Sequence, residues 1–240
     1  MKELVMKRSF HHLNKVIREK FLERKTASKL KSTAIGLAGI ILSACGRNID
    51  PDETGTSLLP TAFDDVLRGS SAVDSITALA GNDTIYGFGG NDQILAGDGN
   101  DTIYGGEGDD YIDPGAGDDT IYGGKGNDTI LLSSGFDIED GGEGIDTVIF
   151  GSDQASLPVT IDLSSGKYHF TDQIASATRN LLNIENIEST AASDITIFDT
   201  TGVNSITTMS GNDIIYSKGG DDTISTGAGN DTVYLNKAKY

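Results

Sequence analysis

The sequence predicts an all-β fold, a parallel β-solenoid made of nine-residue units, and three observations support this prediction. Aspartate recurs every nine residues from Asp74 to Asp146 without a slip. In eight of these nine units an isoleucine or valine follows the aspartate by two positions, and in eight of them a glycine precedes it by two. The chain also holds 31 glycines, which disfavour a helical domain because each glycine costs about 1 kcal/mol in a helix interior.

Each unit divides into a turn and a short strand. The first six residues form a turn, in which glycine permits a positive φ and a close approach of the backbone. The last three, such as 129–131, form a strand whose middle side chain points to one face. Two units make one coil, and successive coils pair in parallel about 4.8 Å apart. The isoleucines then form a thin core between two sheets, with the expected stacks Ile85–Ile103–Ile121 and Ile94–Ile112–Ile130.

The columns of aspartate in the turns require a positive charge. Burial of one aliphatic side chain per unit stabilises the fold by about 2–3 kcal/mol. The loss of conformational entropy on ordering nine residues costs on the order of 9 kcal/mol. Ca²⁺ accepts six to eight oxygen ligands, including backbone carbonyls, so two stacked turns are expected to share an ion, as Asp83 with Asp101 or Asp110 with Asp128. The alternative is a low-complexity acidic spacer that binds no metal. The predicted metal ligands are Gly81, Asp83, Gly90, Asp92, Gly99, Asp101, Gly108, Asp110, Gly117, Asp119, Gly126, Asp128, Gly144, Asp146, Gly211, Asp213, Gly220, Asp222, Gly229 and Asp231.

The unit G-G-x-G-[ND]-D-[TS]-[IV]-[YL], whose first six positions are seen at residues 105–110 and 123–128, resembles the hemolysin-type (RTX) repeat of secreted bacterial toxins, proteases and adhesins. The resemblance implies a right-handed parallel β-roll with Ca²⁺ in its turns. Two units depart from the pattern. Residues 69–77 lack the inner glycines and are expected to cap the array, whereas Phe136 and Glu139 predict a bulge or a weaker metal site in residues 132–140.

Residues 150–188 break the phase and are expected to form a structural insert. Two alternating segments around residues 164–166 predict a β-hairpin, and residues 172–183 are expected to form a short helix. The segment 182–188 resembles the strand that re-enters the solenoid between repeat blocks of large RTX proteins. The phase returns in a second array, residues 189–240, whose last coil is barely capped and is expected to fray without calcium. Its repeat positions are Asn204, Asp213, Asp222 and Asp231, with core residues Ile206, Ile215, Ile224 and Val233.

The first 44 residues are typical of a secretory signal: a basic lead precedes an apolar run from Ala34 to Ala44 that is too short to span a bilayer. Leu42-Ser43-Ala44-Cys45-Gly46 resembles a bacterial lipobox, which implies cleavage before Cys45 and lipid attachment to that residue. Glycine rather than aspartate after the cysteine favours the outer membrane in that family. Residues 45–68 are then expected to be the lipidated cysteine and a flexible tether, and residues 69–149 the first array.

Charge and composition exclude several function classes. From Cys45 onward 33 acidic residues face eight basic ones, which is the opposite of a nucleic-acid-binding surface. His169 is the one histidine of the mature chain, and the sequence has no HExxH zinc helix and no nucleophile elbow. The expected protein is therefore not an enzyme.

Three functions remain open. The first is a calcium-binding surface lipoprotein of the bacterial outer membrane, which serves in adhesion or in surface or matrix structure and contacts a surface polysaccharide or protein. The second is a calcium-dependent carbohydrate-binding module, for which Tyr86, Tyr104 and Tyr122 provide an aromatic ladder at eighteen-residue spacing. The other explanation of that ladder is stacked rings that shield the sheet. The third is a fragment of a larger secreted RTX toxin or enzyme.

Overall fold

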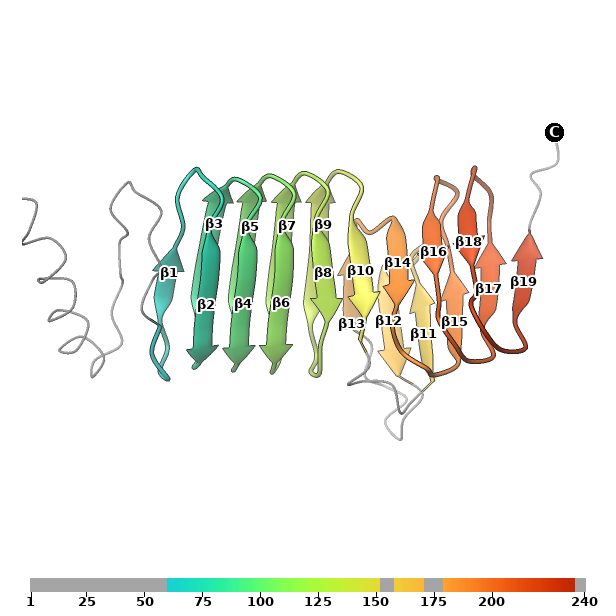
Figure 1. Cartoon of the computed structure of the whole chain (residues 1–240), viewed down its shortest axis with the longest axis horizontal. Helices are drawn as coiled ribbons and strands as arrows, with labels where there is room; N and C mark the ends of the chain where they lie inside the picture. Colours follow the sequence, from blue (N-terminus) through green and yellow to red (C-terminus); the bar gives the residue numbers. More distant parts are fainter. Residues whose placement is uncertain (1–59, 152–157, 171–178, 236–240) are drawn as a thin grey trace, which may run out of the picture. The chain divides into compact units, whose positions relative to one another are not determined.

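The computed structural model describes residues 60–151, 158–170 and 179–235, and in these ranges the chain is all-β with no helix. The strands stack as a parallel β-solenoid of about nine coils (Figure 1). Those of the first array and the coil before it are β1 (Val66–Arg68), β2 (Ser75–Ala80), β3 (Thr84–Gly89), β4 (Gln93–Asp98), β5 (Thr102–Glu107), β6 (Tyr111–Ala116), β7 (Thr120–Lys125), β8 (Thr129–Leu132), β9 (Ile138–Glu143) and β10 (Thr147–Phe150). The insert and the second array contain β11 (Val159–Asp162), β12 (Lys167–Phe170), β13 (Arg179–Leu182), β14 (Asn186–Ser189), β15 (Ile195–Phe198), β16 (Ser205–Thr207), β17 (Ile214–Ser217), β18 (Thr223–Ser225) and β19 (Thr232–Leu235).

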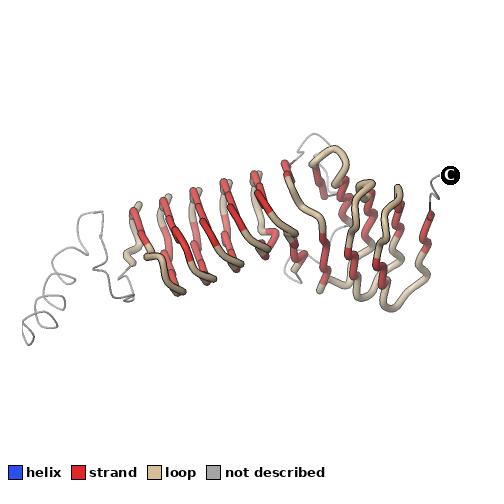
Figure 2. Tube along the Cα trace, turned by 90° about the horizontal axis from the view of Figure 1, so that it is seen from above, coloured by secondary structure: helices blue, strands red, loops and turns tan. Residues whose placement is uncertain are grey.

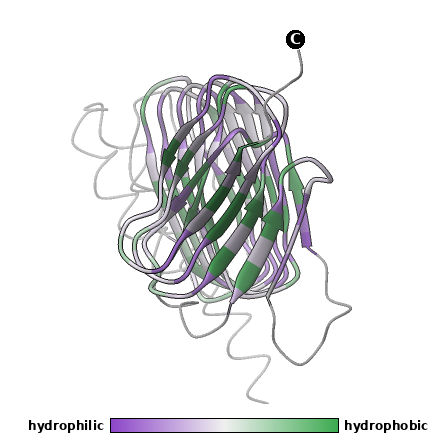
Figure 3. Cartoon of the chain, turned by 90° about the vertical axis from the view of Figure 1, so that its right-hand side faces the viewer, coloured by the Kyte–Doolittle hydropathy of each residue, from purple (hydrophilic) through white to green (hydrophobic). Residues whose placement is uncertain are grey.

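Successive units alternate between two sheets that face each other across the core (Figure 3). Sheet A has the order β1-β3-β5-β7-β9-β13-β12-β11-β15-β17-β19, and sheet B has the order β18-β16-β14-β10-β8-β6-β4-β2. From β2 to β8, each strand pairs in parallel with the strand two units later, so that residues eighteen apart lie side by side. The predicted coil is therefore confirmed.

The core is the predicted column of isoleucines. Ile85 pairs with Ile103 and Ile103 with Ile121 in sheet A, while Ile94 and Ile112 pair in the same way in sheet B. All of these side chains are fully buried. The tyrosines next to them point outward and stack on one another: the ring centroids of Tyr86 and Tyr104 lie 5.0 Å apart with an interplanar angle of 5°. The predicted ladder is thus present along sheet A.

The insert widens one sheet only. Strand β10 pairs directly with β14, so sheet B passes the insert without an additional strand. Sheet A carries β13, β12 and β11 between β9 and β15, where a regular coil would supply one strand. Two additional strands lengthen sheet A by about 10 Å, and Figure 2 shows the regular rows of coils interrupted at this point.

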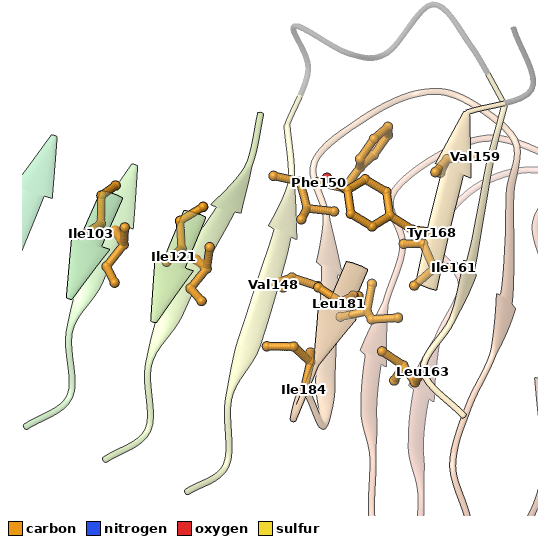
Figure 4. Packing of buried hydrophobic residues seen from close by; sticks show 14 of the residues in the cluster. Ile103, Ile121, Val148, Phe150, Val159, Ile161, Leu163, Tyr168, Leu181 and Ile184 are labelled. Carbon is orange, nitrogen blue, oxygen red and sulfur yellow. The ribbon is translucent and has the colours of Figure 1, made fainter. Parts of the chain in front are cut away.

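Large side chains fill the space that this widening opens in the core. Phe150 and Tyr168 are fully buried there, together with Leu181 and Ile184 (Figure 4). The predicted hairpin is confirmed, since β11 and β12 pair antiparallel around residues 163–166. The segment predicted to re-enter the solenoid does so as β14, which joins β10 to β16.

Three details differ from the sequence-based expectations. The solenoid begins before residue 69, because β1 pairs with β3 and Leu67 is fully buried, so residues 60–68 form part of the first coil rather than a tether. The predicted helix over 172–183 is wrong at its C-terminal end, where Arg179–Leu182 is strand β13, and residues 172–178 lie outside the described ranges. Of the two outcomes expected for residues 132–140, the bulge is absent, since Glu139 keeps the register of Ile121, and the weaker metal site stays a prediction.

The signal, the lipobox and Cys45 also lie outside the described residues. Within the part that the structure does describe, there is no helix with the length and hydrophobicity that a membrane span needs.

Candidate metal sites in the turns

Each repeat aspartate is held in place by its neighbours one coil away. The backbone N–H of Asp83 donates to Oδ1 of Asp101 at 2.7 Å, and that of Asp110 donates to Oδ1 of Asp128 at 2.8 Å. The backbone carbonyl of Asp83 in turn accepts the N–H of Thr102 at 2.8 Å. One carboxylate oxygen is therefore used by the fold in every coil, and this bond fixes the direction of the other oxygen.

That second oxygen has no hydrogen-bond partner within the described residues. This Oδ2 atom is buried in eight aspartates that share the repeat position: Asp83, Asp92, Asp101, Asp110, Asp119, Asp128, Asp146 and Asp213. These eight residues are at most 2% exposed. A buried, unpartnered carboxylate is strongly unfavourable unless a cation or a proton neutralises it. The turns therefore contain a row of oxygens that favour a positive charge.

Burial changes the acidity of these groups. Desolvation, opposed in part by the backbone hydrogen bond, raises the pKa of Asp92, Asp119 and Asp128 to about 7. The pKa of Asp83 is raised to about 6 for the same reason, and the negative charge of Asp101 adds to the effect. Without a metal ion, these carboxylates are expected to hold protons near neutral pH.

Backbone carbonyls converge on the same oxygens. A Cβ atom placed on Gly105 would lie 2.5 Å from Oδ2 of Asp110 and 2.5 Å from the carbonyl oxygen of Gly123 in the next coil. A Cβ placed on Gly123 would meet Oδ2 of Asp128 at 2.4 Å and the carbonyl of Gly141 at 2.5 Å. A methyl group does not fit in this space, which is lined by a carboxylate oxygen and a carbonyl oxygen from adjacent coils.

These first glycines of the unit, Gly87, Gly105, Gly123 and Gly141, were not among the predicted ligands. The motif itself contains the signal, since it begins with a glycine pair in residues 105–106 and 123–124. The ten glycines that were predicted as ligands stay a prediction, and the structure shows a steric reason for glycine at these positions. Each has a φ between 103° and 148°, and a Cβ on any of them would lie 1.5–2.6 Å from backbone of the preceding coil.

The donor set fits a hard cation. Within the described ranges no group of three or more His, Cys, Asp or Glu side chains converges on one point, so zinc-type sites have no support there. Each turn instead combines aspartate oxygens with backbone carbonyls from two coils. Ca²⁺ accepts this mixture, because it takes six to eight oxygens in flexible geometry.

The predicted ligands of the second array are less well enclosed. Asp213 is fully buried and its Oδ2 has no partner, as in the first array. Asp222 and Asp231 are partly exposed. Oδ2 of Asp222 accepts a hydrogen bond from the hydroxyl of Ser217 at 2.7 Å, and that bond reduces its need for a cation.

A comparison with known protein families matches this chain to a calcium-binding repeat. The model of the RTX calcium-binding nonapeptide repeat matches in four copies, at residues 61–94, 86–121, 115–139 and 198–234. The first copy includes residues 61–68, in agreement with the early start of the solenoid. A search of curated proteins finds no match.

Proposed function

The chain belongs to the RTX calcium-binding nonapeptide-repeat family, and from this premise we propose that it is a non-enzymatic surface lipoprotein whose solenoid folds around Ca²⁺ outside the cytoplasm. Calcium binding in general follows from the family. The anchor, the location and the role in adhesion or surface structure are proposals that rest on the sequence of residues 42–46 and on the strongly acidic mature chain.

The row of buried aspartate oxygens without a partner carries the calcium-folding part of this proposal. Desolvation of several carboxylates in adjacent coils is too unfavourable for the thin isoleucine column to offset. A fold that places a buried carboxylate oxygen without a donor beside a backbone carbonyl oxygen in successive coils couples metal binding to folding. Calcium is scarce in the cytoplasm, so the chain is expected to fold after export.

The tyrosine ladder gives the carbohydrate-binding alternative little support. Sugars bind to the open face of an aromatic ring, but the ladder rings cover one another at 5.0 and 5.1 Å. The guanidinium group of Arg68 lies over the ring of Tyr86, 4.9 Å from its centroid. Ring edges rather than ring faces are thus presented to solvent. The same repeats would also suit a part of a larger secreted protein.

The proposal is tested by far-UV circular dichroism of the chain from residue 46, titrated with Ca²⁺ and then with a chelator. We expect a reversible change from coil to β-structure at about 10⁻⁴–10⁻³ M Ca²⁺, the range of extracellular calcium modules, and no change with Mg²⁺. A chain that is already β-structured in chelator at pH 8, where the buried carboxylates have lost their protons, would contradict calcium-dependent folding.

A further inference from the structure

The regular hydrogen bond between successive aspartates is continued by a residue outside both arrays. In the first array the N–H of each repeat aspartate from Asp74 to Asp128 donates to the aspartate eighteen residues later, as Asp128 does to Asp146 at 2.8 Å. After Asp146 the chain leaves the solenoid. Its N–H donates instead to Oε2 of Glu185, 39 residues later, at 2.9 Å. Glu185 therefore takes the place of the next repeat aspartate.

A carbonyl from the same segment replaces that of the missing glycine. A Cβ on Gly141 would lie 2.5 Å from Oδ2 of Asp146 and 2.3 Å from the carbonyl oxygen of Asn183. These distances repeat those at Gly123, where the carbonyl belongs to Gly141. Asn183 adopts a positive φ of 51°, and its side-chain amide donates to Oδ1 of Asp140 at 2.6 Å. The position of its carbonyl is thus fixed by its own backbone and side chain.

The charges at this junction are not balanced by protein groups within the described ranges. Asp146 is fully buried and its Oδ2 has no partner. The negative charges of Glu185 and Asp140 add to the desolvation that raises the pKa of Asp146. The ion pairs found in these ranges, Lys125–Glu107 and Lys218–Asp162, involve neither Asp146 nor Glu185.

We propose that Asp146, Glu185 and the backbone carbonyl of Asn183 form a calcium site in which two of the ligands come from outside the nonapeptide units, and that this ion ties the returning strand β14 to the first array. The inference rests on the proposed function, because it assumes that the regular turns bind calcium. The N–H groups of Glu185 and Asn186 both donate to the carbonyl of Asp146, at 3.1 and 2.9 Å. An ion at this point would therefore hold the junction between insert and array in register.

The variant Glu185→Gln tests this site, with Glu188→Gln as its matched control. Glutamine retains an oxygen that accepts the N–H of Asp146 but loses the charge. Glu188 is an exposed residue of β14, the strand that begins directly after Glu185. Bound Ca²⁺ per full-length chain in detergent is counted by flow dialysis. We expect Glu185→Gln to bind one ion fewer than the wild type, and Glu188→Gln to bind the same number as the wild type.

Hydrogen exchange locates the effect and provides a second measurement. Calcium should protect the amides of 183–189 in the wild type and in Glu188→Gln, and this protection should be lost in Glu185→Gln while strands β3–β7 remain protected. Equal ion counts and equal protection in the two variants would overturn the site, as would loss of protection throughout the array in Glu185→Gln. A wild-type chain that binds no Ca²⁺ would instead contradict the proposed function itself.

Discussion

The two arrays use the same nonapeptide but differ in how completely they bury it. In the first array the core isoleucines, such as Ile103 and Ile112, are fully buried, and so are the repeat aspartates that follow Asp74. In the second array Ile206 and Ile215 are buried, but Ile224 is only partly buried and Val233 is 39% exposed. Among the described strands, β18 and β19 lie at the edges of their sheets. An edge position alone does not account for this exposure, since Leu67 and Ile76 of the edge strands β1 and β2 are buried. The nonapeptide motif by itself therefore does not guarantee burial.

The turns of the two arrays also differ, in the residue at their first position. Glycine fills the first turn position at Gly87, Gly105 and Gly123, which leaves the adjacent carboxylate without a donor. The second array has Thr208 and Ser217 at this position, and Ser217 donates to Asp222. We infer that the first array depends more strongly on calcium than the second.

The largest expected difference between the arrays is in their response to pH without calcium. Folding raises the pKa of Asp92, Asp119 and Asp128 from 3.8 to about 7, so the folded apo chain holds more protons than the unfolded one. The free energy of unfolding of the calcium-free chain is therefore highest at low pH. It falls by at least about 2 kcal/mol in total as the pH rises from about 4 through 7.

Thermal unfolding in chelator at pH 5 and pH 8 measures this change, and hydrogen exchange assigns it to β3–β8. A stability in chelator that is unchanged, or higher at pH 8, would contradict the assignment of buried carboxylates. With saturating Ca²⁺ the sign should reverse, because protons compete with the ion for the same oxygens.

A smaller contrast is expected from truncation of the core. Ile112→Ala should lower the free energy of unfolding of the calcium-loaded chain by about 2–5 kcal/mol, since the side chain is fully buried between two coils. Ile224→Ala should cost about 1 kcal/mol, because that side chain is already partly exposed. Urea unfolding of both variants makes the comparison. Equal losses would show that the second array is packed as tightly as the first.

The smallest expected contrast is between two Gly→Ala variants. It separates the effect of a steric clash from the effect of backbone conformation on stability. Gly126 and Gly219 have nearly the same φ, 127° and 129°. A Cβ on Gly126 would lie 2.2 Å from the carbonyl oxygen of Gly108, whereas a Cβ on Gly219 would meet nothing within 4 Å. Both Gly→Ala variants strain the backbone, but only Gly126→Ala forces two coils apart. We expect it to be less stable than Gly219→Ala by about 1–3 kcal/mol in thermal unfolding. Similar stabilities would indicate that the coils separate easily at residue 126.

Most of the solenoid was predictable because its contacts have one fixed spacing. The stack of Ile85 on Ile103 and the ladder of Tyr86 on Tyr104 both follow from a period of nine residues and two sheets. The first coil was missed because residues 60–68 contain no glycine, and Asp65 and Leu67 alone preserve the phase.

The contacts of the insert could not be derived from that spacing. Glu139 occupies a core position where the pattern requires an aliphatic residue, and the hydroxyl of Tyr168 donates to it at 2.8 Å from 29 residues away. Burial raises the pKa of Glu139 to about 8, so its protonated form suits this apolar site. The bond from Asp146 to Glu185 also spans the insert. No period in the sequence indicates either pair.

The eighteen-residue spacing of the hydrogen bonds also limits how such a chain changes in length. Removal or duplication of one coil leaves every remaining residue on its own sheet, so that Tyr122 still follows a tyrosine and Asp128 still follows an aspartate on the same edge. Removal or duplication of nine residues leaves the nonapeptide motif of the sequence equally intact. It nevertheless moves everything after it to the opposite sheet, interrupts the tyrosine ladder, and places Gly123 on the edge occupied by Ala96 and Pro114. Variants of this protein that gain or lose repeats should therefore do so in pairs.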